Sequence, residues 1–394
     1  MKRKFFSLAL MGMIAIAGVF TSCSSDDDAA PAAAVPAGSI QFDAGVDGFN
    51  ATRALPTTSA NYLSQVTNFA AWAFYSNTVS SFTAGDQYIG SGTTGIVIDG
   101  NLSGVWTHHT ATDLAYWPKN TADKLNFYAI TPASDASFTM ADVGLSNGLH
   151  HLYANVTVPT TNSAQKDIMF AQATDQISTT NNKVVSMGFN HAMTQVVFTG
   201  TLASTNITAT VGGIKVCNIK NTGKVGYLTD DGDNTVTLGV ADVAYGTGAT
   251  TADISFPIGV SATNSLTAYG QTYNLTAADG ALLMLPQTTT AWNPGSDSPK
   301  TIANANTNQK SYLDVTCTIK NGDTYLVGSA SGHGHVYIPF AANWLQGKKY
   351  TYKLIFGTGE GGYDEDGNPL IEPISYTVSE PTAWDAVSDI DVSF

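Results

Sequence analysis

The stretch YTYKLIF, residues 350–356, carries a tyrosine, leucine or phenylalanine at every second position. Successive side chains of a β-strand point to opposite faces of the sheet, so this spacing fills one face of a strand. The same spacing, or a short apolar run bounded by Gly, Asn, Asp or Pro, recurs at Ile40 and Phe42, Phe69 to Tyr75, Leu125 to Ala129, Val196 to Phe198, and Ile214 and Val216. No long stripe with the 3.6-residue period of an amphipathic helix is found. The sequence therefore predicts an all-β protein.

Length and composition set the size of the expected domains. The chain has 394 residues, of which only 12% are charged, and it is rich in Thr, Ser, Gly and Asn. That balance favours strands and turns over solvated helices. A chain of this length is long for one hydrophobic core and comfortable for two. We therefore expect two β-sandwich domains in series, residues 39–180 and 181–394, with the polar stretch Thr179–Lys183 as the linker between them.

The N-terminus has the pattern of an export signal. The basic residues Lys2–Lys4 precede the apolar run Phe5–Phe20, which is shorter than the roughly 20 residues that cross a bilayer. The run ends in small residues before Cys23, and this ending resembles a bacterial lipobox, in which the cysteine thiol is acylated. Residues 1–23 are therefore predicted to be a lipoprotein signal peptide with Cys23 as the lipidated residue. An ordinary signal peptide with an incidental cysteine is the alternative.

A polar and small-residue segment follows the cysteine. Three aspartates, Asp26–Asp28, lead into an Ala- and Pro-rich stretch that ends at Gly38. Such a segment buries too little apolar surface to offset its ordering entropy, so residues 24–38 are predicted to be a tether. Acidic residues just behind a lipidated cysteine resemble a signal for display on the outer face of the outer membrane in some Gram-negative anaerobes. We therefore expect an outer-membrane, surface-exposed precursor.

Arg53 is the only arginine that remains once residues 1–23 are removed. An arginine-specific protease would have one target in that chain, the bond between Arg53 and Ala54. The segment SIQFDAGVDGF, residues 39–49, includes an alternating apolar set that would fill one place in the first sheet. Cleavage would remove the strand within residues 39–53 and expose an open edge, which is a template for another strand. The alternative is that this strand permanently completes its own sheet.

The C-terminus ends on a second alternating pattern. Ile390, Val392 and Phe394 occupy every second position up to the last residue. Residues from about 370 to 394 are therefore predicted to include a donor arm for a neighbour's open edge. Head-to-tail insertion of this kind need not close into a ring, so it builds a filament. The alternative is that the arm completes its own sheet.

Several fragments together resemble the fimbrillins, the type V pilins and related lipoproteins of certain Gram-negative anaerobes. They are AYWPKNTADKLNFYAITPA at 115–133, KDIMFAQAT at 166–174, VSMGFNHAMTQVVFTG at 185–200, LLMLPQ at 282–287, IPFAANWLQGKKYTYKLIFG at 338–357, and TRA at 52–54. The resemblance implies two transthyretin-like β-sandwich domains and lipoprotein export. It also implies cleavage after an arginine near the mature N-terminus, and polymerisation by strand exchange with other fimbrial subunits.

Net charge limits the binding partners that the chain can have, and cysteine content limits its disulfides. Without residues 1–23 the chain keeps 14 of its 17 basic residues and all 31 acidic ones, a net charge of −17. Nucleic acid is therefore not an expected partner, because phosphate binding needs clustered Lys and Arg. Cys217 and Cys317 could form one disulfide or could both be buried apolar residues. We favour the second interpretation, because unpaired cysteine is commonly buried.

Patterns of catalysis and metal binding are missing from the sequence. It contains no GxSxG elbow, HExxH motif or phosphate-binding glycine loop. All four glutamates lie at or beyond Glu360, so a glycosidase would have to draw its paired carboxylates from aspartates or from this tail. His333 and His335 have the spacing of two metal ligands on one strand face, but no third ligand is identifiable. We therefore expect no enzymatic activity, no cofactor and no metal.

The aromatic residues could also indicate a sugar-binding function. Tryptophans stack on sugars in many binding sites, but Trp117 and Trp344 flank predicted strands and are better explained as core residues. The polar loop from Trp292 to Lys310 is the better candidate for a variable exposed surface.

The predicted function is that of a fimbrial structural subunit, a pilin, exported as a lipoprotein and cleaved after Arg53. A tip adhesin or an anchor subunit is the alternative within the same family. A surface lipoprotein that binds glycans and never polymerises is the alternative from another class. The ligand that the fimbria contacts and the identity of the protease stay open.

Overall fold

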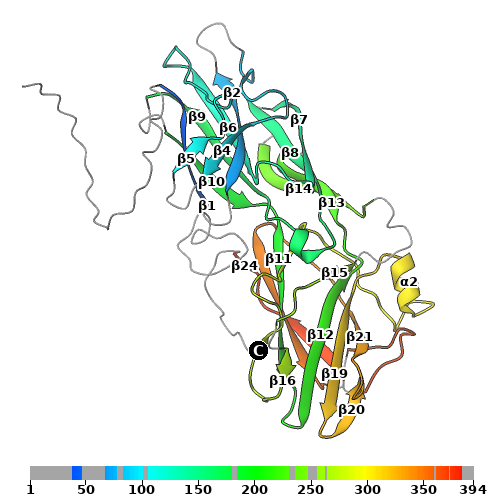
Figure 1. Ribbon diagram of the computed structural model, residues 1–394. Helices are drawn as coiled ribbons and strands as arrows, with labels where there is room; N and C mark the ends of the chain where they lie inside the picture. The colour runs from blue at the N-terminus through cyan, green and yellow to red at the C-terminus, as the bar shows by residue number, and fades with distance from the viewer. Residues whose placement is uncertain are drawn as a thin grey trace, which may run out of the picture. The chain divides into compact units, whose positions relative to one another are not determined.

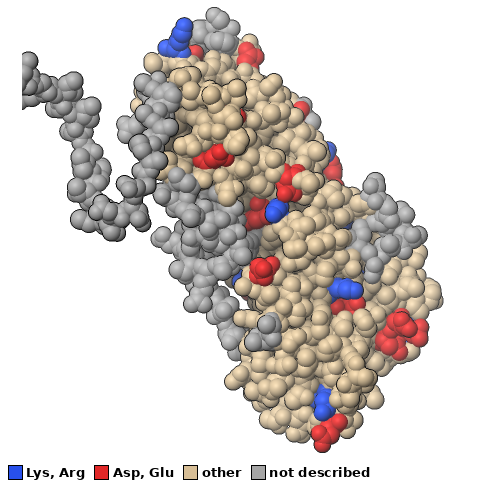
Figure 2. Space-filling view, viewed as in Figure 1, with Lys and Arg blue, Asp and Glu red and all other residues tan. Residues whose placement is uncertain are grey.

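A computed structural model describes most of the chain after residue 37. The described residues are 38–46, 67–77, 83–100, 105–146, 148–179, 184–229, 236–246, 255–261, 264–358, 361–371 and 373–383. They form four β-sheets with only two short helical segments, so the predicted all-β class is confirmed (Figure 1). Charged side chains are sparse on the face drawn in Figure 2, in keeping with their 12% share of the sequence.

Sheet I holds the strands nearest the N-terminus. Its order is β1 (Gln41–Val46), β10 (Val184–His191), β9 (Met169–Gln176), β6 (Lys124–Thr131), β2 (Asn68–Asn77), β4 (Ile96–Gly100) and β5 (Trp106–His108), with β3 (Gln87–Ile89) beside β2. Strand β1 runs parallel to β10, whereas the other pairs are antiparallel. The alternation seen at Leu125, Phe127 and Ala129 does form a strand, β6, as predicted.

Sheet I is buried on both faces. Along β2, Trp72 and Phe74 belong to one core cluster, while Phe69, Ala73 and Tyr75 belong to another. Because neighbouring residues of a strand point to opposite faces, burial on both sides makes the strand apolar at every position. This explains why residues 69–75 read as a continuous apolar run rather than as an alternation.

Sheet II covers the face of sheet I that carries Trp72 and Phe74. Its order is β14 (Val236–Ala244), β13 (Thr222–Thr229), β8 (Leu149–Thr157) and β7 (Phe138–Ser146). The ring of Tyr227 from β13 lies 5.4 Å from the ring of Tyr128 in sheet I. The imidazole of His150 from β8 stacks on Phe74 with 3.6 Å between centroids. These contacts join the two sheets into a sandwich.

Sheets III and IV hold the remaining described strands. Sheet III has the order β17 (Tyr273–Asn274), β11 (Thr194–Leu202), β22 (Lys348–Phe356) and β23 (Ile374–Val378), with β18 (Leu282–Met284) beside β11 and β24 (Thr382–Ala383) beside β22. Sheet IV has the order β15 (Ser255–Pro257), β12 (Ile207–Cys217), β19 (Tyr312–Asn321) and β20 (Thr324–Val327), with β16 (Ser265–Leu266) beside β12 and β21 (Gly334–Pro339) beside β19.

The alternating stretch at 350–356 forms β22, and its apolar set faces the core between sheets III and IV. Tyr350, Tyr352, Leu354 and Phe356 are all buried. Tyr352 stacks on Phe198 of the parallel neighbour β11, with 5.6 Å between ring centroids, and contacts Phe340, which follows β21, at 4.9 Å. The apolar residues at every second position of β22 therefore form one buried face, as predicted.

Strand pairing crosses the boundary predicted between residues 180 and 181. Strands β10, β13 and β14 follow that boundary, yet β10 pairs with β9 and β13 pairs with β8. One core cluster runs from Trp72 of sheet I to Phe356 of sheet III. The division into the domains 39–180 and 181–394 therefore stays a prediction.

Two short helical segments interrupt the strands, η1 (Asn162–Ala164) and α2 (Ile302–Thr307). Helix α2 lies within the loop predicted to be a variable exposed surface. The hydroxyl of Thr301 caps it by accepting a hydrogen bond from the Asn304 amide at 3.3 Å. Trp292, at the start of the loop, is fully buried, and its indole N–H donates to the Lys300 carbonyl at 3.0 Å. The expectation of an exposed loop is therefore wrong at Trp292.

The remaining core predictions concern two cysteines and two tryptophans. Cys217 and Cys317 are both buried thiols, and burial raises the pKa of Cys317 to about 12. In the pairing of β12 with β19, Cys217 is opposite Tyr312 while Cys317 is opposite Val211, so the two thiols are not cross-strand neighbours. Trp344 is buried and Trp117 packs half-buried against the second core cluster, as predicted. In the described part of the chain, no helix has the length and apolarity needed to span a membrane.

Candidate functional site: the slot of strand β1

Strand β1 and the three residues before it, 38–40, have backbone partners on two sides. On one side β1 pairs in parallel with β10, in a register that runs from Gln41 opposite Val184 to Val46 opposite Phe189. On the other side the Ile40 amide donates to the Ala115 carbonyl at 2.9 Å, and the Trp117 amide donates to the Gly38 carbonyl at 3.4 Å. We call this place, between β10 and residues 115–117, the β1 slot.

The floor of the β1 slot is aromatic. Ile40 is fully buried and Phe42 is 6% exposed, whereas Asp43 points to solvent. The Phe42 ring makes edge-to-face contacts with Phe69 and Phe127, at centroid distances of 5.8 and 5.9 Å. Edge-to-face pairs of this kind add to the free energy of apolar burial. Ile40 and Phe42, the described buried members of the alternating apolar set predicted in residues 39–49, therefore face the core, as expected.

His108 of β5 forms a further wall of the β1 slot. Its ring centroid lies 6.2 Å from that of Phe42, so the two end strands of sheet I meet over the second core cluster. The Nε2 atom of His108 is buried and has no hydrogen-bond partner in the described residues. Burial lowers the pKa of this imidazole, and the nearby Asp113 carboxylate opposes the shift. His108 is therefore favoured in its neutral form.

The outer wall of the slot is anchored independently of β1. The Tyr88 hydroxyl donates to the Tyr116 carbonyl at 2.7 Å, which fixes the middle of the 115–117 segment. The Asp113 carboxylate accepts hydrogen bonds from the Val97 and Thr110 amides, at 3.0 and 2.9 Å. These contacts connect the wall to β3 and β4 rather than to β1, so they do not depend on β1 being present.

Burial energetics show what β1 contributes. Complete burial of an Ile or Phe side chain is worth about 1.5–3 kcal/mol, so Ile40 and Phe42 together contribute about 3–6 kcal/mol. Whole domains are stable by only about 5–15 kcal/mol. A chain deprived of β1 would therefore expose an energetically costly slot unless another strand filled it.

The residues predicted for processing and donation, Cys23, Arg53, Ala54, Ile390, Val392 and Phe394, lie outside the described residues. Their assignments stay predictions. The flanking strands locate two of them along the chain, because β1 ends at Val46 and β2 begins at Asn68. Arg53 and Ala54 therefore belong to the connection between β1 and β2.

The described part of the predicted arm pairs within its own chain. Strand β23 runs antiparallel to β22, with Ile374 opposite Phe356 and Val378 opposite Tyr352, and β24 continues along β22 at Ala383. Residues 374–378 and 382–383 are therefore strands of sheet III. Any donor arm lies beyond Ala383.

The chain also matches a known protein family. A model of the fimbrillin-like family matches residues 52–378. The chain belongs to the fimbrillin-like family. The matched region starts one residue before Arg53, so strand β1 precedes it.

Solved structures resemble the chain more weakly. A fimbrial protein from Bacteroides vulgatus shares 15% identity at a TM-score of 0.47, covering 88% of this chain and 99% of that one. A putative cell adhesion protein from Bacteroides uniformis shares 12% identity at a TM-score of 0.43, covering 89% and 99%. The tip fimbrial protein Mfa3 of Porphyromonas gingivalis shares 10% at 0.34, covering 82% and 96%. No curated protein matches the chain.

Family membership fixes the broad role. Fimbrillin-like proteins are structural fimbrial or adhesion proteins rather than enzymes, and they act at the cell surface with other fimbrial subunits. Sequence reasoning missed three parts of the β1 slot, namely the parallel partner β10, the wall at 115–117 and His108. Residues 115–117 begin the fimbrillin-like fragment 115–133, but nothing in their spacing predicts that they lie beside β1.

Proposed function

We propose that this fimbrial subunit is made as a lipoprotein precursor, acylated at Cys23 and displayed at the outer membrane. An arginine-specific protease then cleaves the bond between Arg53 and Ala54. The released chain polymerises when a strand from another subunit takes the place of β1 in the β1 slot. The finished fimbria is a chain of subunits joined by such exchanges.

The single observation that supports this proposal is the arrangement of β1. The strand occupies an end position of sheet I, buries Ile40 and Phe42, and is connected to β2 through the residues that include Arg53. Before cleavage, the connection gives β1 a high effective concentration at its own slot, which excludes a competing strand. After cleavage that advantage is lost, because β1 is then held only by noncovalent contacts.

The chain's own C-terminus has a suitable donor pattern. Ile40, Phe42 and Ala44 occupy alternate positions of the resident strand, and Ile390, Val392 and Phe394 alternate in the same way. A strand with this alternation buries one row of side chains and leaves the other in water. Insertion of one subunit's C-terminus into the next subunit's slot joins different surfaces, so it builds a filament.

The test compares the wild-type chain with Arg53→Lys under an arginine-specific endoprotease. Lysine keeps the positive charge and the side-chain length but removes the target. We expect the wild type to acquire Ala54 as its first residue and to form multimers that survive detergent, as read by mass spectrometry and gel electrophoresis. Arg53→Lys should stay intact and monomeric.

Two results would contradict the proposal at different steps. Multimers formed equally by the intact Arg53→Lys chain would show that cleavage is not the trigger. A wild-type chain that is cut after Arg53, keeps residues 38–46 bound and stays monomeric would show that β1 is not exchanged.

A further inference from the structure

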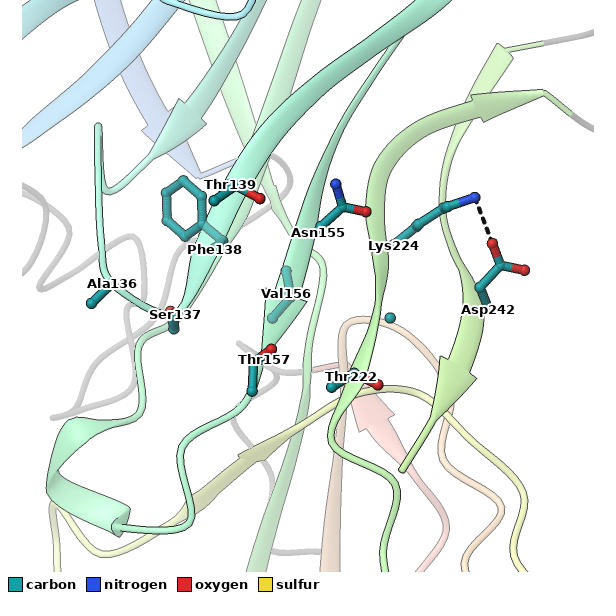
Figure 3. A pocket seen from close by; sticks show the side chains of 11 residues that line it. Ala136, Ser137, Phe138, Thr139, Asn155, Val156, Thr157, Thr222, Lys224 and Asp242 are labelled. Carbon is teal, nitrogen blue, oxygen red and sulfur yellow. Dashed lines mark ion pairs between the residues drawn. The ribbon is translucent and has the colours of Figure 1, made fainter. Parts of the chain in front are cut away.

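A groove of about 360 Å³ lies on the outer face of sheet II (Figure 3). Its side chains come from all four strands of that sheet. The strand register places Thr139 of β7 opposite Asn155 of β8, and Asn155 opposite Lys224 of β13. A second pair, Thr157 and Thr222, lies two residues along the same strands. Register therefore builds a row of polar side chains across the sheet.

The end of this row is shaped by an irregularity in the pairing of β13 with β14. The register shifts between Thr222 and Lys224, and Asp242 of β14 adopts a φ of 53°. Bulges re-aim side chains, and a positive φ is uncommon outside glycine. The result is an ion pair with 2.6 Å between Lys224 Nζ and Asp242 Oδ2. The same ammonium lies 5.5 Å from the centre of the Tyr153 ring.

Charge and hydrogen-bonding capacity indicate what the groove accepts. Lys224 and Asp242 are the charged residues of its lining, and they neutralise each other. The hydrogen bond to Asp242 raises the pKa of Lys224, which favours the charged ammonium. The Asn155 amide and the Thr139 and Thr157 hydroxyls each both donate and accept hydrogen bonds. A ligand with many hydroxyl groups and no net charge matches this set.

We propose that the groove on sheet II binds a neutral carbohydrate of one or two sugar units. Its volume falls at the lower end of the roughly 300–1,000 Å³ usual for small-molecule sites. Phe138 and Val156 belong to the buried core cluster on the other face of these strands, so the groove presents the row of polar side chains to the sugar. Asn155, Thr157 and the Lys224–Asp242 pair supply the partners for its hydroxyls. Such a site adds an adhesive function that does not depend on the β1 slot.

The first experiment uses saturation-transfer NMR on the purified chain. The probes are glucose, galactose, mannose, N-acetylglucosamine, lactose and chitobiose at millimolar concentration. We expect at least one of them to receive saturation from the protein. Asn155→Ala and Thr157→Val should each weaken that binding about tenfold, the loss expected for a missing hydrogen bond. Thr208→Val, on β12 of sheet IV, is the matched control and should bind as the wild type does.

Two outcomes of this experiment would overturn the proposal. One is a wild-type chain to which none of the six sugars binds. The other is sugar binding that Asn155→Ala and Thr157→Val both leave unchanged while their melting temperatures equal that of the wild type.

A second experiment tests the charge balance. Glucosamine, N-acetylglucosamine and glucuronate are similar in size and carry a positive, zero and negative charge. We expect the wild type to prefer the neutral sugar. Asp242→Asn leaves the Lys224 charge unmatched and should shift the preference toward glucuronate, whereas Lys224→Gln should shift it toward glucosamine. A wild-type chain that binds glucuronate or glucosamine more tightly than N-acetylglucosamine would overturn the assignment of a neutral ligand.

Discussion

The two ends of the described chain both lie at sheet edges, but they are built differently. Strand β1 and the residues just before it fill a slot: Ile40 is fully buried, Phe42 is 6% exposed, residues 41–46 pair with β10, and Gly38 and Ile40 hydrogen-bond to residues 117 and 115. Strand β23 begins with a fully buried Ile374 but ends at Val378, which is 50% exposed. Its ladder runs along β22 alone within the described sheet III. The N-terminal strand is therefore an inserted strand and the C-terminal strand is a covering one.

This difference assigns complementary roles to the two ends. Loss of an inserted strand leaves a slot with an aromatic floor and two walls, which only another strand can fill. Loss of a covering strand leaves an open edge on β22, where the backbone could instead be hydrated. The acceptor of an exchange is therefore expected at the N-terminal edge, in agreement with the proposed function.

The largest expected effect on stability comes from truncating Phe42 of β1, and it is compared with truncation of Val378 of β23. Phe42→Ala should lower the free energy of unfolding by about 3–5 kcal/mol, because it leaves a cavity among Phe69, Phe127 and His108. Val378→Ala removes a half-exposed side chain and should cost no more than about 0.5 kcal/mol. Denaturant unfolding of the two variants beside the wild type measures both. Equal losses would remove the distinction between an inserted and a covering strand.

Strands β1 and β23 can be predicted from the sequence because each buries one row of side chains. Ile40 and Phe42 at one end, and Ile374 and Tyr376 at the other, alternate with residues that are more exposed or polar. A period of two reports that a face is buried, but it does not identify the neighbouring strand. The pairing of β1 with β10 joins Gln41 to Val184, far apart in sequence, and no local pattern specifies it.

Two other expectations relied on the polar composition of a single segment. The boundary expected at 180/181 relied on the polar stretch Thr179–Lys183, although β10, β13 and β14 return to sheets I and II after it. The loop from Trp292 was expected to be exposed because of its polar composition. Its groups instead bond within the loop, as when the Thr301 hydroxyl caps α2 and the backbone carbonyl of Lys300 accepts a hydrogen bond from the Trp292 indole. Composition reports the average environment of a segment, whereas these contacts depend on single positions.

A smaller loss of stability is expected when the pH is lowered, and only at the N-terminal edge, where β1 lies. Burial holds the pKa of His108 below its ordinary value of 6.5, so the unfolded chain binds a proton more readily than the folded one. The stability contributed by neutral His108 is complete above pH 6.5 and is lost as the pH falls toward the lowered pKa of the folded state. Strands β22, β23 and β24 contain no histidine.

Hydrogen exchange measures this contrast at the two edges. Between pH 7 and about pH 5.5, the β10 amides beside β1 should lose protection, after correction for the intrinsic exchange rate, while the β22 amides keep theirs. His108→Leu removes the titrating group and should make protection of β10 independent of pH in this range. Persistent loss of protection in His108→Leu would assign the effect to another group.

The smallest effect on stability, and the sharpest test of the comparison, is expected from deleting Asp389 to Phe394. The described part of sheet III is complete at Ala383, where β24 pairs with Lys348, so the deleted residues follow its last described strand. If they serve as a donor arm, the cleaved monomer should melt near the wild-type temperature yet fail to extend a filament. If they instead complete their own chain's core, the deletion leaves cavities, and each kcal/mol lost lowers the melting temperature by roughly 2–4 °C. Calorimetry of the truncated monomer beside a polymerisation assay separates the two cases, because only a donor arm abolishes assembly without lowering the melting temperature.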